Sequence, residues 1–549
     1  MPTPDHQLGR FYTPPDLADL VARLALSGRA AARAWDPTCG GGALLHAIAR
    51  HQPAALVGTD VDGAALDALR PLLPAADLRH ADLFDLTPDD LGPVDTIVGN
   101  PPFLRTERIP APRRAALRAR ISAALGSPVD GSVDLSLLAL VWCCRFLAPN
   151  GRLAFVMPST SLDVRGGAAL RASLATEYRI RLILDSAVEP WFSEVAVNTV
   201  VVVVDREGHG PTRFARLRRR ARNTSAASLL EGPRSRPLPA AALTAPRWSP
   251  LLRAPSIWWD LLQRAGDRLV PLGERLDLAY GTKPGISAFF APSEPTSIEP
   301  ELLRPFLRTL RGQHRYEIQP EHVGGRLFVV PPELDDDSLP PGARAWVDRG
   351  AQRLTRGGVS WPEAPSVRGN RPWWRLPPPR SGPVLVPQFR GDRHHVLANP
   401  ARLPVNNSAW HGRWRDPRHE ELGIALLNSS IAALSAEVEG RTNLGEGLLT
   451  LYGPELRALR VPDPAVFSGA HAAEIRDVWD ALRARPVLPF PAERDQPDRQ
   501  RLDAAVLEGL GLDPALASPI ADGAVDLLTV RLHLADARRS DRAGVGSSR

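Results

Sequence analysis

The chain has 549 residues, more than one compact core usually serves, so two or three domains are expected. Hydrophobic residues make up 44% and charged residues 23% of the chain, and no apolar run is long enough to span a bilayer, which argues against the membrane-spanning classes. The net charge is +6 and the sequence pI is about 9.7, which is only a weak bias toward anionic partners.

The first 206 residues alternate between helical and strand-like patterns of apolar residues. The predicted elements, in chain order, are a helix at 14–30, a strand ending at Asp36, a helix at 43–52, a strand at 54–60, a helix at 62–73, a strand ending at Asp82, a strand at 95–98, a helix at 133–147, a strand at 152–158, a helix at 166–176, and strands at 179–187 and 197–206. This alternation predicts an α/β fold with a parallel sheet covered by helices on both faces. The last two strands follow each other directly and predict an antiparallel pair at one end.

The composition changes after residue 206. Residues 206–250 are basic and then rich in Pro and Ala, which is typical of a connecting segment. Residues 250–465 are rich in Trp, Pro, Arg and Gly with short strand-like runs, and residues 466–534 return to helical spacing. We therefore expect a first domain at 1–240, a mixed α+β domain at 250–465, a helical segment at 466–534 and a disordered tail at 535–549.

The three cysteines, Cys39, Cys143 and Cys144, do not have the spacing of metal ligands. Neither a zinc site nor a disulfide framework is therefore predicted, and no metal is expected. Cys143 and Cys144 lie in an apolar helical pattern and are expected in the core. The N-terminal segment has no basic stretch followed by an apolar one, so we expect the cytoplasm as location and no membrane partner.

Polar residues stand at the ends of successive predicted strands, namely Asp36, Asp60, Asp82 and Asn100. The turn "DPTCGGG" after the first strand lets a ligand approach the backbone, although its spacing is not that of GxGxxG. One such residue alone is explained equally well as the start of a loop, whereas four in register favour a nucleotide-like ligand at the carboxyl edge of the sheet. Asp60 can accept from ribose hydroxyls, and Asp82 from an exocyclic amine.

The loop "GNPPF" at 99–103 carries a specific chemistry. A nucleobase amine is a poor nucleophile because its lone pair is delocalised into the ring. The side-chain oxygen of Asn100 and the backbone carbonyl of Pro101 can accept both amine hydrogens, while two prolines stiffen the turn. Phe103 offers a face for stacking a planar base, which must first be flipped out of a duplex. An Asn-Pro-Pro sequence alone also fits an ordinary rigid turn.

In the order of its motifs, the chain resembles the gamma-class N6-adenine DNA methyltransferases of restriction–modification systems. The resemblance is carried by "FYTPP", "DPTCGGG", "NPPF" and "EPWFSEVAVNTVVVVV". It implies a Rossmann-like methyltransferase sheet at 1–240, S-adenosylmethionine as cofactor, and a DNA target-recognition domain at 250–465. It also implies transfer of a methyl group to the N6 amine of a flipped-out adenine in duplex DNA, since NPPF favours adenine over cytosine.

The same resemblance assigns roles to individual residues. Around the cofactor it places Thr13, Pro14, Asp36, Thr38, Gly40, Asp60 and Asp82, with Asp60 on the ribose and Asp82 on the adenine amine. It makes Asn100, Pro101 and Phe103 catalytic, and it packs Phe192 against the flipped base. In the second half, "YGTKPGISAFF" and "GRTNLGEGLLTLYGPELRALRVP" look like the segments that open and close recognition domains.

Possible DNA contacts in the second half are Lys283, which is the single lysine, together with Gln388, Arg390, Trp373 and Trp374. The tryptophans are equally explained as core residues of a poorly helical domain. The basic run 213–222 fits either the DNA backbone or a solvated edge.

Three alternative functions share some of these features. A protein glutamine N5-methyltransferase has the same Asn-Pro-Pro-aromatic loop but is much shorter. An RNA adenine methyltransferase usually adds a small RNA-binding module. A catalytically silent DNA-binding specificity protein should have lost the loop and the acids, which are intact here. No nuclease carboxylate–lysine set is apparent, so any restriction endonuclease is expected to be a separate polypeptide.

Overall fold

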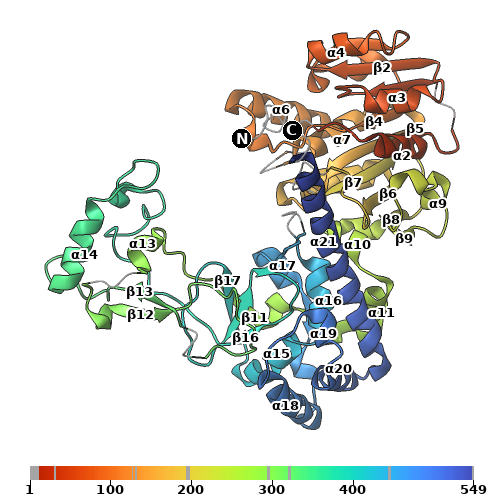
Figure 1. The fold of residues 1–549 in the computed structure, drawn as a ribbon. Helices are drawn as coiled ribbons and strands as arrows, with labels where there is room; N and C mark the ends of the chain where they lie inside the picture. Colours follow the sequence, from red (N-terminus) through yellow and green to blue (C-terminus); the bar gives the residue numbers. More distant parts are fainter. Residues whose placement is uncertain are drawn as a thin grey trace. The chain divides into compact units, whose positions relative to one another are not determined.

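The computed structural model describes residues 11–29, 32–126, 128–129, 133–192, 198–293, 297–319, 323–442 and 447–546 (Figure 1). The chain divides into two compact units. Unit 1 comprises Met1–Ala254, Thr442–Gly447 and Thr529–Arg549, and unit 2 comprises Pro255–Arg441 and Leu448–Leu528. Most of the helical segment 466–534 thus belongs to the same unit as residues 255–441.

Unit 1 is built on a nine-stranded sheet in the order β3-β2-β1-β4-β5-β7-β6-β8-β9 (Figure 1). The strands are β1 Arg33–Asp36, β2 Ala55–Asp60, β3 Asp77–His80, β4 Val94–Gly99, β5 Leu147–Pro158, β6 Arg179–Ser186, β7 Thr199–Asp205, β8 Thr212–Leu217 and β9 Arg236–Leu238. Strands β3, β2, β1, β4 and β5 are parallel, which confirms the predicted α/β sheet. Strand β7 is antiparallel and lies between β5 and β6, not at one end as expected.

The segment after residue 206 is not a connection, because strands β8 and β9 extend the same sheet. The arginines of its basic run are used to hold this extension. The Arg213 guanidinium donates to the backbone carbonyls of Gly232 and Ser235. Arg216 pairs with Asp185 on the neighbouring strand at 2.7 Å. At least these two arginines therefore have a structural role.

The helices of unit 1 are α2 Pro15–Leu26, α3 Ala43–Ala49, α4 Gly63–Leu69, α5 Pro88–Leu91, α6 Ala111–Leu125, α7 Leu135–Cys144, α8 Ala168–Glu177, α9 Ala226–Leu230 and α10 Ser249–Arg253. Helix α2 begins at a proline and buries a stripe that includes Leu17, Leu20 and Leu24 against strands of the sheet. Helix α7 is buried at every residue after the first, which confirms Cys143 and Cys144 as core residues. The prediction missed α6, because Ile121 is its only buried residue and no apolar stripe marks it.

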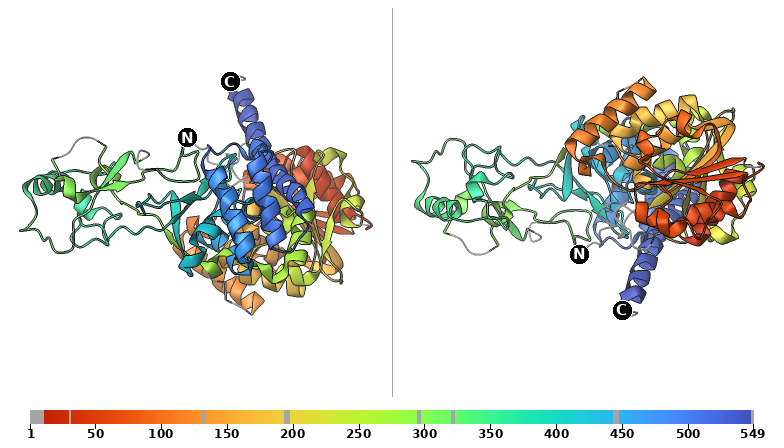
Figure 2. Two further views of the ribbon diagram at one scale, coloured as in Figure 1. Left: turned by 90° about the horizontal axis from the view of Figure 1, so that it is seen from below. Right: turned by 90° about the horizontal axis from the view of Figure 1, so that it is seen from above.

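Unit 2 contains one four-stranded sheet, β11-β17-β14-β16, and three two-stranded pairs. Its strands are β10 Leu269–Pro271, β11 Leu276–Tyr280, β12 Leu303–Phe306, β13 Gly325–Phe328, β14 Val384–Pro387, β15 Phe389–Arg390, β16 Leu397–Ala398, β17 Ala409–Trp414, β18 Leu449–Thr450 and β19 Arg460–Pro462. Its helices are α11 Ser256–Ala265, α12 Leu272–Arg275, α13 Ser287–Phe290, α14 Pro341–Ala351, α15 Glu420–Leu427, α16 Ser430–Glu439, α17 Gly453–Ala458, α18 Gly469–Arg483, α19 Phe490–Glu493 and α20 Pro497–Gly509. Helices α18 and α20, blue in Figure 2, pack side by side.

Trp374 lies in a hydrophobic cluster of unit 2, and the half-buried Trp373 packs against that cluster. Trp374 is 3% exposed, and the Trp373 ring packs 4.7 Å from that of Phe289. Their role as core residues, the second of the two expectations, is the one that the structure supports.

The C-terminal helix α21 spans Ala517–Gly546. It therefore includes residues 535–546, which were expected to be disordered, and residues 547–549 lie outside the described part of the chain. Within the described residues no single helix is both long and apolar enough to cross a membrane. The segments Pro417–Leu427 and Ser430–Glu439 meet that test only together, with a bend of 77° between them.

Candidate active site

The predicted polar residues gather at one edge of the unit 1 sheet. Asp36 and Asp60 are the last residues of β1 and β2, and Asn100 directly follows β4. Asp82 follows β3 by two residues. Because these four strands are parallel and adjacent, their carboxyl ends place all four side chains on the same edge.

The glycine-rich turn after β1 is held by the two aspartates. The Thr38 backbone N–H donates to Asp36 Oδ1 at 3.1 Å, and the Gly40 N–H donates to Asp60 Oδ2 at 2.8 Å. Gly40 has a φ of +47°, and a Cβ there would meet nothing within 4 Å, so the space above this backbone is open. A ligand can therefore approach the turn closely.

Asp36 has an unusual electrostatic environment because it is only 1% exposed. The pKa of its carboxyl is raised to about 8: burial is the main cause, the N–H of Thr38 opposes it, and the charge of Asp60 adds to the rise. A buried carboxyl without a cationic partner is favourable for a ligand that brings positive charge.

Asn100 is fixed in one orientation by its amide nitrogen. Nδ2 donates to the backbone carbonyl of Phe11 at 2.7 Å and to Thr13 Oγ1 at 3.1 Å. A carbonyl can only accept, so the nitrogen must face Phe11 and the oxygen must face the other way. That oxygen, Oδ1, is buried and has no hydrogen-bond partner among the described residues.

Three phenylalanine rings pack beside this amide. The Phe11 and Phe103 centroids are 5.5 Å apart, those of Phe103 and Phe192 are 5.9 Å apart, and those of Phe11 and Phe192 are 6.4 Å apart. The structure thus brings together Phe103 and Phe192, which the sequence singled out, and adds Phe11. Phe11 could have been found from the sequence, because it is the aromatic residue two positions before Thr13 in "FYTPP".

The far side of the loop is held by Asp134, which the sequence analysis did not select. The loop backbone pairs with residues 133–135: Thr106 N–H donates to Val133 at 3.1 Å, and Leu135 N–H donates to Leu104 at 2.8 Å. Asp134 Oδ2 accepts from the hydroxyls of Thr160 at 2.9 Å and Ser161 at 3.2 Å, just after β5. From sequence, Asp134 looks like an ordinary residue before an apolar helix.

Asp82 is less open than expected. Its Oδ1 accepts from the Phe84 N–H at 3.0 Å, and its Oδ2 pairs with Arg113 of helix α6. A cofactor amine at this position would share the carboxylate with Arg113. Pro14, directly after Thr13, is the N-cap residue of helix α2.

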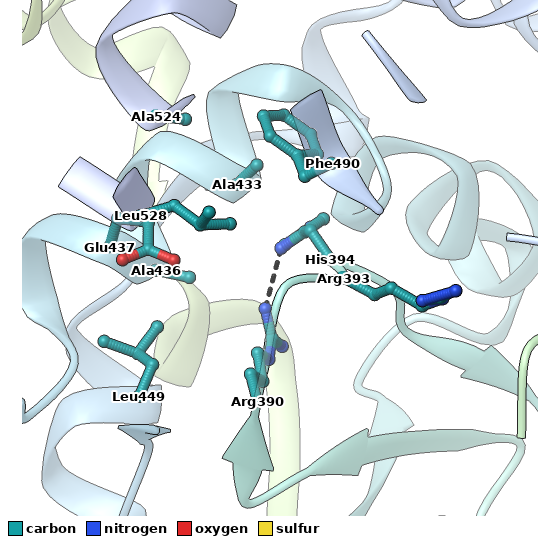
Figure 3. A pocket seen from close by; sticks show the side chains of 10 residues that line it. All are labelled: Arg390, Arg393, His394, Ala433, Ala436, Glu437, Leu449, Phe490, Ala524 and Leu528. Carbon is teal, nitrogen blue, oxygen red and sulfur yellow. Dashed lines mark hydrogen bonds between the residues drawn. The ribbon is translucent and has the colours of Figure 1, made fainter. Parts of the chain in front are cut away.

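Two of the predicted DNA contacts in unit 2 are buried, which contradicts that role. Gln388 is 3% exposed and its side-chain oxygen accepts from the Tyr280 hydroxyl at 2.8 Å. Arg390 is 5% exposed and points into a small interior cavity, where its guanidinium lies 2.8 Å from His394 Nδ1 (Figure 3). In strand β15 the outward position belongs to Phe389, which is 41% exposed. Lys283 is exposed, as expected.

The residues at the edge fit a nucleoside cofactor with a cationic end. The hydroxyl of Thr38 and the Oδ1 of Asn100 are buried and unpartnered within the described residues, and the backbone at Gly40 is open. Each Asp60 oxygen accepts one backbone N–H, from Gly40 or Asp62, and keeps a lone pair for a hydroxyl donor. Among the described residues no three His, Cys, Asp or Glu side chains are grouped to hold a metal.

Comparison with known proteins identifies the class. The family model "Eco57I restriction-modification methylase" matches residues 77–192, and "Type II methyltransferase M.Eco57I, C-terminal domain" matches residues 311–493. Type II methyltransferase M.PaeR7I of Pseudomonas aeruginosa is 26% identical over 424 residues, which cover 72% of this chain and 70% of that protein.

Two solved structures align with most of this chain. The Type IIL restriction–modification enzyme MmeI, solved in complex with DNA, aligns with a TM-score of 0.52 at 12% identity over 95% of this chain and 74% of that one. The type IIG restriction endonuclease BpuSI aligns with a TM-score of 0.45 at 15% identity over 96% of this chain and 66% of that one.

The fold and the edge define an S-adenosylmethionine-dependent methyltransferase with a C-terminal domain. Two separate parts of the chain are thus similar to Eco57I-type restriction–modification methylases, residues 77–192 to the methylase model and residues 311–493 to the C-terminal domain model. The resemblance stated from the motifs is thereby confirmed at the level of the family.

Proposed function

We propose that the enzyme methylates the N6 amine of an adenine flipped out of duplex DNA, at a specific recognition sequence. The observation that carries this proposal is the Oδ1 atom of Asn100, which is buried, turned away from the Phe11 carbonyl and unpartnered among the described residues. Leaving such an acceptor unpaired costs about 1–3 kcal/mol, so the site is built for a ligand that donates a hydrogen bond.

An exocyclic amine has two hydrogens to donate, and the turn offers two acceptors. Asn100 Oδ1 takes one, and the backbone carbonyl of Pro101 takes the other. With both hydrogens held, the nitrogen is drawn toward a pyramidal geometry, and its lone pair is freed from the ring. The two prolines fix this arrangement before the substrate arrives, so little reorganisation is needed.

The phenylalanine cluster supplies the surface for the base. Phe103 is half-buried and in contact with Phe192. A flipped base can stack on such a ring, a contact that contributes about 1–3 kcal/mol. A base within a duplex cannot reach this edge of the sheet, so base flipping is part of the proposal.

The cofactor belongs above the glycine-rich turn. When bound, S-adenosylmethionine supplies an electrophilic methyl group. Asp36 would hold its cationic end, Asp60 would accept from the ribose hydroxyls, and Thr38 would offer its buried, unpartnered hydroxyl. Thr13 and Pro14 would approach the cofactor from the N-terminal segment, because the Thr13 hydroxyl accepts a hydrogen bond from Asn100. With the cofactor bound, Asn100 and Pro101 would hold the amine while its nitrogen takes the methyl group, the cofactor would leave as the neutral thioether, and the proton lost from the nitrogen would pass to solvent.

Duplex DNA is favoured over the alternative substrates by unit 2. A protein glutamine methyltransferase does not need a second unit that spans most of residues 255–528. The relatives are named Type II methyltransferases, and MmeI was solved with DNA. We place the enzyme in the cytoplasm because its proposed substrate is there, and we assign any restriction activity to a separate polypeptide.

The test measures the incorporation of labelled methyl groups into DNA. The DNA is purified from the natural host after its gene for this enzyme has been deleted. Purified wild type should transfer labelled methyl groups from S-adenosylmethionine, and Asn100→Ala should be about 100-fold slower or worse. Asn223→Ala is a matched control, because this exposed asparagine lies on unit 1 outside the site. Equal rates for Asn100→Ala and wild type would contradict the proposal.

A further inference from the structure

Helix α6, which is orange in Figure 1, is not attached to unit 1 in the usual way. It carries four arginines and no acidic residue, and Ile121 is its only buried residue. A helix in a folded protein is normally held by an apolar face, and this packing supplies most of its stability. Helix α6 has no such face, so apolar packing explains little of its attachment.

The segment that binds this helix carries the opposite charge. Residues 81–90 contain four acidic residues and neither arginine nor lysine, the four being Asp82, Asp85, Asp89 and Asp90. Arg113 of the helix pairs with Asp82, and Arg120 pairs with Asp85 at 2.6 Å. The two arginines are about two helical turns apart and therefore lie on the same face of the helix. Charge complementarity thus docks helix α6.

The docking is weak at the beginning of the helix and firmer near its end. The side chains of Arg113 and Arg120 are 66% and 47% exposed, and ion pairs at such exposure stabilise little and are screened by salt. Ile121, by contrast, is fully buried, and the Ser122 hydroxyl accepts from the Val129 N–H at 2.8 Å. The helix can therefore swing about its Ile121 end when the ion pairs break.

The first of these ion pairs lies in the expected cofactor site. Asp82 is the residue that the motif resemblance places on the adenine amine of the cofactor, and its Oδ2 is the atom to which Arg113 donates. Its Oδ1 is already used by the Phe84 N–H at 3.0 Å. A carboxylate oxygen can accept two hydrogen bonds, so Oδ2 can hold a guanidinium and an amine together. Because the Asp82 side chain is only 20% exposed, however, the docked arginine stands at the approach to it.

We propose that helix α6 is a charge-held cover for the adenine end of S-adenosylmethionine, and that Arg113 is a positioning residue that acts through Asp82. The helix swings outward to admit the cofactor and to release the spent cofactor, and it docks again through Arg113 and Arg120. The inference deepens the proposed function, because it rests on the adenine of the cofactor lying at Asp82. It adds that the exchange of the cofactor is limited by two exposed ion pairs.

The test measures how fast labelled S-adenosylmethionine binds to the full chain and how fast it leaves during a chase with unlabelled cofactor. Arg120→Gln removes one docking contact without touching Asp82. At about 0.05 M salt, both the association and the dissociation rate should rise about three- to fivefold, the value of one exposed ion pair, with little change in Kd. Arg50→Gln is the matched control, since Arg50 is 62% exposed and pairs with Asp19 elsewhere in unit 1.

Salt and charge reversal test whether charge holds the cover. Raising the salt to about 0.5 M should bring both rates of the wild type close to those of Arg120→Gln. Arg120→Asp should exchange the cofactor at least as fast as Arg120→Gln. Adding Asp85→Arg to it should restore most of the slow exchange, because the reversed pair docks the helix again. If the double variant exchanges the cofactor as fast as Arg120→Asp alone, the ion pair does not hold the cover.

Hydrogen exchange of the wild type is a second measurement that needs no variant. A detached helix of 15 residues is only marginally stable and frays, which exposes its amides. The amides of residues 111–125 should therefore exchange faster at high salt and more slowly with saturating S-adenosylmethionine, whereas those of the buried helix α7 should not respond. Amides of α6 that exchange as slowly as those of α7 under all conditions would overturn the cover.

The outcomes separate this inference from the proposed function. If Arg120→Gln leaves both rates unchanged, or speeds dissociation while slowing association, helix α6 is not a cover. Asn100-dependent methylation of DNA would still support the proposed function in that case. If the wild type does not methylate DNA, the proposed function fails, whereas the exchange rates of the cofactor still decide whether α6 covers it.

Discussion

In the proposed mechanism a single amide, that of Asn100, carries most of the chemistry. The Asn100 amide nitrogen donates to two acceptors of the N-terminal segment, the Phe11 carbonyl and the Thr13 hydroxyl. The amide oxygen therefore faces away from that segment. A free asparagine side chain would rotate and satisfy its own oxygen. The segment before helix α2 therefore sets the orientation of the Asn100 amide, which is the acceptor in the proposed mechanism.

The hydroxyl of Thr13 is expected to matter for turnover more than for cofactor affinity. Thr13→Val keeps the shape but removes one acceptor of the Asn100 amide. We expect kcat to fall about three- to tenfold, the value of one ordinary hydrogen bond, with the Kd of S-adenosylmethionine nearly unchanged. Steady-state methylation and calorimetry measure the two quantities. Thr13→Ser, which keeps the hydroxyl, should restore kcat; failure to do so would argue against the bond.

The buried carboxyl of Asp36 predicts a pH dependence of stability. Its pKa is about 8 in the folded protein against 3.8 for the ordinary group, so the folded state holds a proton that the unfolded state releases over this range. The enzyme without cofactor should therefore lose stability as pH rises between about 4 and 8, and no further above that. Urea unfolding of wild type and Asp36→Asn across this range measures it. The two proteins should converge at low pH, and parallel curves would contradict the assignment.

At the scale of elements, the loop is clamped on both sides. Helix α2 and its leading segment hold one side, and Asp134 joins the other side to the turn after β5. Burial raises the pKa of Asp134, while the hydroxyls of Thr160 and Ser161 oppose that shift. The Asp134 network therefore links the loop after β4, the start of helix α7 and the turn after β5.

Removing this clamp should loosen the loop without emptying the cofactor site. Asp134→Ala leaves two hydroxyls without their acceptor, and we expect a loss of about 1–3 kcal/mol in the free energy of unfolding together with a lower kcat. Asp134→Asn keeps an oxygen in place and should recover most of both. The measurements are urea unfolding and steady-state methylation. If Asn and Ala variants behave alike, Asp134 does not act through these hydrogen bonds.

The elements that could be predicted from sequence are those with a simple apolar pattern. Strands β4 and β7 are buried runs of hydrophobic residues, and helix α2 has a clear buried stripe. Helix α6 has no such stripe, and strands β8 and β9 are rich in arginine and proline, so neither pattern indicated an element. Local sequence does not show that arginines will pair inside a sheet extension.

The candidate site was predictable to the extent that it depends on strand ends. Parallel strands bring Asp36, Asp60 and Asn100 to one edge whatever the details of packing. The direction of the Asn100 amide depends on a contact 89 residues away along the chain, which no local pattern reveals. The same holds for Gln388 and Arg390, whose burial is set by the alternation of strand β15 and its neighbours.

At the scale of the whole molecule, all the residues assigned to the cofactor lie in unit 1. Unit 2 is stabilised by its own buried network. Glu493 accepts from Tyr316 at 2.8 Å and from Arg485 at 2.8 Å, and Arg499 is fully buried beside them. Burial raises the pKa of Glu493, but the hydrogen bond from Arg485 and the charge of Arg499 lower it by more.

Damage to this network should separate the two units functionally. Glu493→Gln leaves the buried Arg499 without its nearest charge, and we expect unit 2 to lose about 3–5 kcal/mol of stability. DNA binding should weaken strongly, whereas the Kd of S-adenosylmethionine should change little. Urea unfolding, DNA binding and calorimetry measure these effects. A loss of cofactor affinity as large as that of DNA affinity would show that the cofactor site depends on unit 2.

The most direct measurement is single-molecule sequencing of DNA from cells that express either the wild type or Asn100→Ala. We predict N6-methyladenine at one recurring sequence with the wild type and none with the variant. Modification of cytosine, or equal adenine methylation in both samples, would contradict the central claim that the Asn100 oxygen prepares an adenine amine for methylation.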